Sequence, residues 1–140
     1  EREGTIRYGV GAVAAASTCP TPWARVMVRR MFGVAGLAHV GPHQYVLAWP
    51  SMESGSVPPE GGVAVAFARQ IAAAADPAKE RAALEAKFRS AMDPLLAGDA
   101  LSVHEVIWPS ETRPMLIQWL HTQLPLLPAL RGPVTFPYRP

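Results

Sequence analysis

A short run of small residues could do chemistry with its main chain alone. The run covers residues 32–36 and follows an apolar stretch at residues 26–28 that predicts a buried strand. Its glycines let a ligand approach the backbone closely. A helix that begins here would also point its first N–H groups outward, as donors to an oxygen that carries negative charge. These properties are typical of an oxyanion hole, which serves chemistry on carbonyl groups.

Two glutamates offer a different chemistry. Glu53 and Glu60 could act as a carboxylate pair in acid–base catalysis. Loop-forming Gly and Pro residues separate them, so no regular element sets the distance between the carboxylates. We therefore favour solvated or salt-bridged glutamates over a catalytic pair.

Metal binding and thiol chemistry have less support. His39 and His43 are four residues apart, but a Gly-Pro pair between them prevents a shared helical face. His104 and His121 belong to other elements, and no thiolate completes a ligand set, so we assign no metal site. The single cysteine, Cys19, lies in a Pro-rich loop. A nucleophile there would need a histidine partner, and we interpret Cys19 as structural or incidental.

The composition indicates one globular domain. Apolar residues make up 49% of the 140, which is enough for a core, and no apolar run approaches the length of a membrane span. The positive charge is scattered and mostly arginine, which argues against nucleic-acid binding. One cysteine excludes an internal disulfide and favours a reducing compartment, either the bacterial cytoplasm or the mitochondrial matrix. The first residues resemble a helix already under way, so we expect a piece of a longer protein.

Hydrophobic periodicity and turn residues predict alternating helices and strands. We expect strands at residues 23–29, 44–48 and 105–108, a loop at 54–62, and helices at 6–17, 33–38 and 62–75. Two more helices follow Asp76 and Ser110, which are the expected N-caps. This alternation indicates an α/β domain over residues 1–124, followed by an extended Pro-rich tail at residues 125–140. Three or so strands are too few for a complete sheet, which again indicates part of a larger fold.

Three motifs resemble those of the biotin-dependent acyl-CoA carboxyltransferases, the family of the propionyl-CoA and acetyl-CoA carboxylase beta subunits. They are RRMFGVAG at residues 29–36, AWPSME at residues 48–53 and PSETR at residues 109–113. They occur in the family's order and at about its spacing. The resemblance runs from about Glu1 to about Leu120. It implies a crotonase-like fold, built from strand-strand-helix turns, of which this chain is the C-terminal half that binds biotin.

The resemblance also implies the residues of a biotin site. The main-chain N–H groups of Val34 and Ala35 would hold the ureido carbonyl of biotin, with Gly33 and Gly36 on either side. Many family members have Gly at the position of Val34 and an aromatic residue at that of Gly36. We therefore expect a site that is narrower at Val34 and wider at Gly36.

The second motif implies a wall of the same site. This wall would consist of Trp49, Pro50 and Ser51, beside the proposed N–H donors. The third motif adds to the resemblance but brings no catalytic group.

The resemblance further implies the reaction and its components. A carboxyl group would move from carboxybiotin, attached to a carrier domain, to the α-carbon of a short acyl-CoA. The expected partners are the biotin carboxyl carrier or biotin carboxylase subunit, the acyl-CoA half of the same protein, and further copies in a homo-oligomer. No nucleic acid or membrane is expected. The protein would supply positioning, water exclusion and oxyanion holes rather than a side-chain acid or base.

Other interpretations remain open. The differences at Val34 and Gly36 suit a catalytically inactive carboxyltransferase-like partner or scaffold subunit. Another crotonase-fold enzyme acting on acyl-CoA thioesters is a further alternative, although the second and third motifs favour a carboxyltransferase. The sequence does not identify the acyl group or the size of the oligomer.

Overall fold

The fold is that of a computed structural model, which describes residues 4–37, 41, 44–100 and 102–132. Its strands are β1 (Trp23–Met27), β2 (Arg30–Phe32), β3 (Gln44–Ala48), β4 (Glu53–Gly55) and β5 (Glu105–Val106). Its α-helices are α1 (Thr5–Thr18), α2 (Gly33–Leu37), α3 (Pro59–Ala66), α4 (Ala68–Ala73), α5 (Pro77–Ser90), α6 (Pro94–Asp99), α7 (Thr112–Gln123) and α8 (Leu127–Leu130). Two short 3-10 helices are η1 (Pro109–Glu111) and η2 (Leu124–Leu126).

The strands form two small parallel sheets. One sheet has the order β1-β3-β5, and the other pairs β2 with β4. Each strand of the first pair leads into a strand of the second sheet and then into a helix, which gives the order β1-β2-α2 followed by β3-β4-α3. The chain therefore makes the same strand-strand-helix turn twice. This is the α/β organisation expected from the sequence.

The bends between the two sheets are tied together by backbone hydrogen bonds. The N–H of Trp49 donates to the carbonyl of Met27 at 3.0 Å, and the N–H of Glu53 donates to the carbonyl of Arg29 at 2.8 Å. The register places Met27 opposite Ala48 in the first sheet and Phe32 opposite Gly55 in the second. The two strand-strand segments therefore run side by side, parallel and in register.

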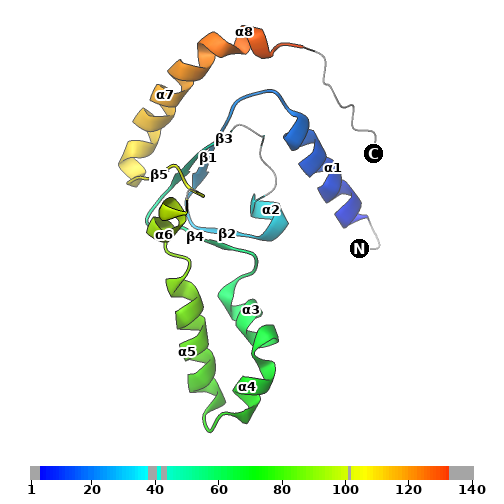
Figure 1. Ribbon diagram of the computed structural model, residues 1–140, viewed down its shortest axis with the longest axis vertical. Coiled ribbons are helices and arrows are strands. Elements are labelled where there is room, and N and C mark those ends of the chain that lie inside the picture. Colours follow the sequence, from blue (N-terminus) through cyan, green and yellow to red (C-terminus); the bar gives the residue numbers. More distant parts are fainter. Residues whose placement is uncertain (1–3, 38–40, 42–43, 101, 133–140) are drawn as a thin grey trace.

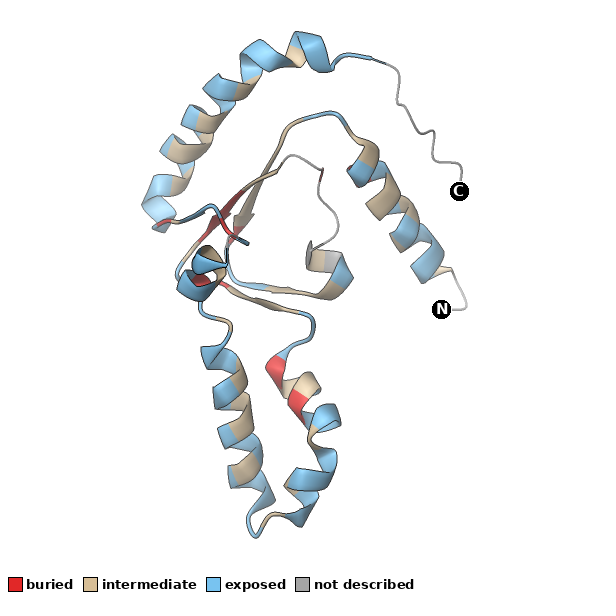
Figure 2. Cartoon of the chain, in the orientation of Figure 1, coloured by how far each residue is buried: buried red, intermediate tan, exposed pale blue. Residues whose placement is uncertain are grey.

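The core is formed by β1 and β3 together with the residues just before β4 and β5. Its buried members are Met27, Val46, Ala48, Met52 and Val103. Figure 2 shows the buried residues gathered on the strands and on the start of α3, whereas α5 and α7 are mostly exposed. Figure 1 shows why: the helices from α3 to α5 extend away from the sheets at one end, and α7 and α8 arch over the other.

Apolar side chains on the outer helix are left exposed. Ile117 and Leu120 on α7 are 43% and 44% exposed, and Leu126 beyond it is 51% exposed. The chain thus exposes apolar surface on this outer helix and just beyond it. Within the residues described, no helix has both the length and the apolar character needed to cross a membrane.

Several sequence-based elements are confirmed. Strand β3 has the predicted bounds, and helices α1 and α2 lie where the sequence places them. The side chain of Asp76 accepts a hydrogen bond from the N–H of Lys79 at 3.0 Å, so Asp76 is the N-cap of α5.

Other predictions of secondary structure are wrong. The strand expected at residues 23–29 ends at Met27, and the chain bends there into β2. The loop expected at residues 54–62 contains most of β4 and the start of α3, and the helix expected at residues 62–75 is divided at Phe67. Three-residue strands are too short to show a period of two, so the sequence gives them no signal.

The predicted start of α7 and the predicted tail also need correction. Ser110 lies inside η1, and no side chain caps the N-terminus of α7. Instead, the carboxylate of Glu111 accepts a hydrogen bond from the N–H of Trp108 at 2.7 Å. Residues 124–130 are helical rather than extended, because their prolines occupy the first turns of η2 and α8, where proline is tolerated. Residues 133–140 of the predicted tail lie outside the described part of the chain.

The burial pattern predicts where the fold is most sensitive. Leu47 is fully buried in β3, whereas Val65 on α3 is 82% exposed. Leu47→Ala should lower the free energy of unfolding by about 2–5 kcal/mol, because it leaves a cavity in the packed centre. Urea denaturation measures this change, with Val65→Ala as the control that should stay within about 0.5 kcal/mol of the wild type. Equal effects of the two substitutions would contradict this placement of the core.

Candidate functional site

The turn from β2 into α2 has a backbone that favours glycine. Gly33, the first residue of α2, has a φ of 63°, in the left-handed region that side chains disfavour. A Cβ at this position would lie 3.4 Å from the carbonyl oxygen of Ser56, beyond the end of β4. The turn therefore combines an unusual backbone angle with the close approach of a second segment.

The next two residues carry the N–H groups expected to bind an oxyanion. Val34 and Ala35 lie in the first turn of a helix of five residues, where N–H groups have no acceptor within the helix. Outside regular helices and strands, the N–H of Val34 donates no hydrogen bond to any of the described residues. The side chain of Val34 is 66% exposed. The backbone geometry therefore fits the predicted donors.

Gly36 is required by close packing rather than by its backbone angle. A Cβ there would clash with Cγ of Met31 and would lie 3.3 Å from the Met31 carbonyl carbon. The extra width expected at Gly36 is thus taken up by Met31.

The guanidinium of Arg25 contacts the same helix. Nη1 of Arg25 in β1 donates to the carbonyl of Gly36 at 3.5 Å. Burial lowers the pKa of Arg25, and its buried Nε has no hydrogen-bond partner among the described residues. Arg25 therefore places positive charge near the C-terminal end of α2, where it is favourable to the helix dipole.

The predicted wall residues have other contacts. Nε1 of Trp49 donates to Oγ1 of Thr112 at 2.8 Å, and Oγ of Ser51 donates to the carbonyl of Val28 at 2.6 Å. Pro50 borders a cavity of about 620 Å³, which is further lined by Met52, Glu53, Arg89, Ser90, Met92, Asp93, Pro94, Leu95, Val106 and Trp108. The second motif thus holds the third against the end of β3.

The predicted wall residues and the Gly33 turn lie at opposite ends of the small sheet. The Trp49–Ser51 segment precedes β4, at the end of the small sheet where Arg30 lies opposite Glu53. Gly33 follows the other end, where Phe32 lies opposite Gly55. The segment that reaches Gly33 is therefore Ser56, which the sequence did not single out.

The two glutamates form ion pairs with one arginine. Nη2 of Arg30 lies 2.8 Å from Oε2 of Glu60, and Nε of Arg30 lies 3.6 Å from Oε2 of Glu53. Glu60 also binds Nη2 of Arg89 through its other oxygen, at 2.7 Å. A hydrogen bond from the backbone of Glu60, the Arg89 guanidinium and then Arg30 lower the pKa of Glu60 to about 2, against an opposing effect of desolvation. The salt-bridged interpretation of these glutamates is confirmed.

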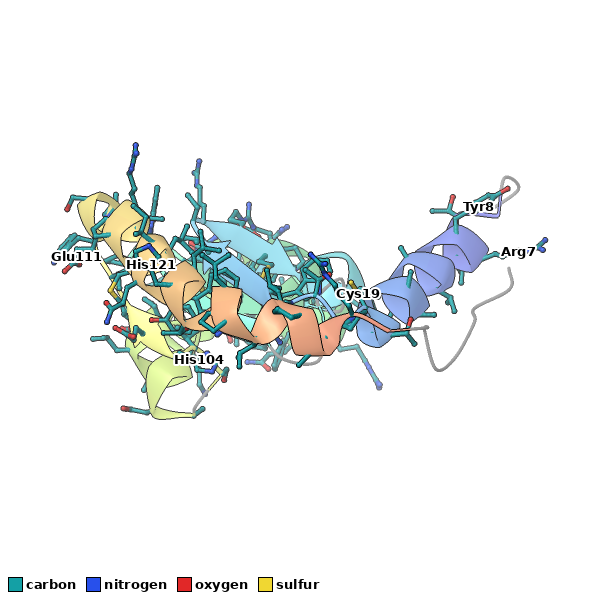
Figure 3. The ribbon with its side chains drawn as sticks, turned by 90° about the horizontal axis from the view of Figure 1, so that it is seen from above. Arg7, Tyr8, Cys19, His104, Glu111 and His121 are labelled. Carbon is teal, nitrogen blue, oxygen red and sulfur yellow. The ribbon has the colours of Figure 1, made fainter. Side chains whose placement is uncertain are left out.

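The histidines and the cysteine lie apart. Figure 3 shows Cys19 after α1, His104 before β5 and His121 on α7. Nδ1 of His104 accepts a hydrogen bond from the N–H of Val46 at 3.0 Å, so this imidazole provides an acceptor for the backbone of β3. In the part of the chain that the structure describes, no group of three or more His, Cys, Asp or Glu could hold a metal ion. His39 and His43 lie outside that part.

Comparison with known proteins identifies the family. Residues 1–125 match the family described as the carboxyl transferase domain. The chain belongs to this family. Among its relatives, the propionyl-CoA carboxylase carboxyltransferase subunit of Haloferax mediterranei is 32% identical over 122 residues, which make up 84% of this chain and 23% of the relative. The methylmalonyl-CoA carboxyltransferase 12S subunit of Propionibacterium freudenreichii is 33% identical over 117 residues, 81% of this chain and 22% of the relative.

A solved structure extends the likeness to the fold. The transcarboxylase 12S crystal structure, a hexamer with methylmalonyl-coenzyme A and methylmalonic acid bound, has a TM-score of 0.81 and 30% identity to this carboxyltransferase domain. The match covers 99% of this chain and 26% of the 12S chain. The chain thus spans about a quarter of the length of the relatives it matches.

Some residues around the turn were missed by sequence reasoning. Arg25, Met31 and Ser56 approach α2 from β1, β2 and the end of β4. Met31 lies inside the first motif, which could have drawn attention to it. Arg25 and Ser56 carry no signal of their own, because only the pairing of the strands brings them to this turn.

The backbone at Gly33 generates a stability prediction. Gly33→Ala should lower the free energy of unfolding by about 1–2 kcal/mol, because alanine disfavours a positive φ. Gly61→Ala in α3 is the matched control, since an added Cβ there meets no atom within 4 Å. That substitution should leave stability unchanged or raise it by up to about 1 kcal/mol. Similar losses in both variants, measured by urea denaturation, would contradict the left-handed conformation of Gly33.

The low pKa of Glu60 predicts a dependence of stability on pH. The folded protein binds fewer protons at this carboxyl than the unfolded chain, whose pKa is near 4.5, so the contribution of Glu60 is fully present above about pH 4.5. It should be lost as the pH falls from there towards about 2. Thermal unfolding across this range should therefore show a smaller loss of stability in Glu60→Gln than in the wild type. Parallel curves would show that Glu60 titrates normally.

Proposed function

We propose that this chain forms the biotin side of the active site in the carboxyltransferase component of a biotin-dependent acyl-CoA carboxylase. The observation that carries the proposal is the Gly33 turn, which lies inside a family match over residues 1–125 and leaves the N–H groups of Val34 and Ala35 without an acceptor in their helix. The repeated strand-strand-helix turns support a partial crotonase-like fold.

Carboxybiotin, when bound, supplies the carboxyl group that is transferred to the α-carbon of a short acyl-CoA. The N–H groups of Val34 and Ala35 bind and stabilise the ureido oxygen. The positive φ of Gly33 orients these donors, and the absence of a side chain at Gly33 lets the ureido ring of biotin approach the backbone. Gly36 keeps the helix close to Met31, so the donors stay in place.

Trp49, Pro50 and Ser51 remain proposed wall residues of this site. The hydrogen bond from Trp49 to Thr112 and that from Ser51 to Val28 give these two residues a second role in holding α7 and the bend after β1. We therefore expect substitutions at Trp49 to act partly through α7.

The remaining components of the reaction are part of the proposal. The acyl-CoA half would come from another part of the same protein, and the biotin from a carboxyl carrier or biotin carboxylase subunit. The 12S relative, whose structure is a hexamer with methylmalonyl-coenzyme A bound, supports a homo-oligomer and an acyl-CoA substrate. A reducing compartment, such as the cytoplasm or the mitochondrial matrix, remains an expectation from the single cysteine.

Carboxyl transfer in the complete protein tests the proposal. The assay follows decarboxylation of malonyl-type CoA esters with free biotin as the acceptor. Turnover that depends on biotin would support the carboxyltransferase. A folded oligomer without turnover on short acyl groups would favour the inactive partner instead, and turnover without biotin would favour another acyl-CoA enzyme.

Removal of a main-chain donor is the sharper test of the site. Ala35→Pro removes one N–H that has no acceptor within the helix, so it should lower kcat by about 100-fold or more while the protein stays folded. Ala35→Gly keeps the N–H and should retain most of the activity. Cys19→Ala and His39→Ala should also retain it. Loss of transfer in a folded Cys19 or His39 variant would contradict a mechanism based on main-chain donors.

A further inference from the structure

We infer that Arg30, held by Glu60, is a positioning residue that sets the geometry of the Gly33 turn. The inference rests on the proposed function, because it concerns the N–H donors of that turn. Neither side chain is proposed to touch biotin or the acyl-CoA.

Arg30 connects the turn to three neighbouring groups. Its guanidinium lies 5.4 Å above the centre of the Phe32 ring, and Phe32 directly precedes Gly33. The same guanidinium binds Glu60 at 2.8 Å and reaches Glu53 at 3.6 Å. One side chain in β2 thus contacts the aromatic ring next to the turn, the adjacent strand β4 and the start of α3.

Glu60 joins this arginine to the helices beyond the sheet. Its second oxygen binds Arg89 near the end of α5 at 2.7 Å, and its backbone carbonyl accepts a hydrogen bond from Arg81 at 3.5 Å. The helices from α3 to α5, which project away from the sheets in Figure 1, are linked through Glu60 to the strand that leads into the turn.

The link also fixes the segment that faces the turn. Ser56 approaches Gly33 through its carbonyl oxygen, and Glu60 follows four residues later, in the first turn of α3. The Arg30–Glu60 pair therefore holds this connection against β2. When the pair is broken, Ser56 and Phe32 lose a shared restraint, and the donors at Val34 and Ala35 can leave the productive geometry.

The exposure of these side chains distinguishes positioning from general stabilisation. The side chains of Arg30, Glu60 and Arg89 are 44%, 41% and 42% exposed. Ion pairs this open to solvent contribute little to global stability. Their loss should therefore change the rate of transfer much more than the unfolding of the protein.

The experiment compares charge-removing variants of the complete carboxyltransferase. Glu60→Gln and Arg30→Gln each remove one side of the pair, and Arg30→Lys keeps the charge without the forked guanidinium. Glu80→Gln is the matched control, because it makes the same change on α5 at a carboxylate bound by Gln70. We measure kcat and the KM values for biotin and the CoA ester in the decarboxylation assay, together with the thermal unfolding midpoint.

We expect Glu60→Gln and Arg30→Gln to lower kcat by between about tenfold and 100-fold, as small displacements of reacting groups do. The KM for the CoA ester should match that of Glu80→Gln, and the unfolding midpoint at neutral pH should lie only slightly below that of Glu80→Gln, because solvent screens the ion pair. Arg30→Lys should recover part of the lost rate. The two losses of rate should be less than additive in the double variant, because both single variants remove the Arg30–Glu60 interaction.

Two results would overturn the inference alone. Biotin-dependent turnover in the wild type together with a kcat within about twofold in both Gln variants would show that the pair does not position the turn. If kcat falls only in those variants whose unfolding midpoint also falls well below that of Glu80→Gln, the pair has a merely structural role. Absence of biotin-dependent turnover in the wild type would instead overturn the proposed function, and this inference with it.

Discussion

The bend that carries the chain from β1 into β2 lies against the matching bend from β3 into β4. Backbone hydrogen bonds from Trp49 to Met27 and from Glu53 to Arg29 keep the two bends in step. Because strand pairing repeats along both sheets, this single alignment also decides what meets at their far ends. Phe32 comes to lie opposite Gly55, and Ser56 therefore faces Gly33. The candidate site depends on this register.

Helix α2 depends for its stability on contacts with other segments. A helix of five residues has too few internal hydrogen bonds to be stable alone. Contacts from three directions hold it: Met31 packs against Gly36, Arg25 donates to the Gly36 carbonyl, and Ser56 lies against Gly33. The glycines are thus used for two different reasons, a left-handed angle at Gly33 and close packing at Gly36. Main-chain donors need such support, since no side chain of their own can adjust to a ligand.

The sequence predicted the elements whose signals are local. Strand β3 alternates little but is bounded by a Gly-Pro pair and Trp49-Pro50, and Asp76 followed by proline marks the start of α5. The short strands β2 and β4 were not predicted, because three residues show no periodicity and only their pairing defines them. The same limit applies to the site. The motif predicted the donors, whereas Arg30 and Glu60 are thirty residues apart and no spacing rule connects them.

The second and third motifs acquire a physical meaning that the resemblance did not provide. Trp49 donates to Thr112, so the residues after β3 anchor the first turn of α7. Glu111 accepts from the N–H of Trp108 and thereby shapes the chain just before that turn. Neither contact reaches the Gly33 turn. A motif of this family can therefore mark the place where an outer helix is attached to the sheet, as well as the place where chemistry occurs. In the first motif, Arg30 binds across to Glu60 at the start of α3, and Val34 and Ala35 are the proposed N–H donors. The proposed chemistry by the main chain would thus depend on side chains elsewhere that hold the backbone in place.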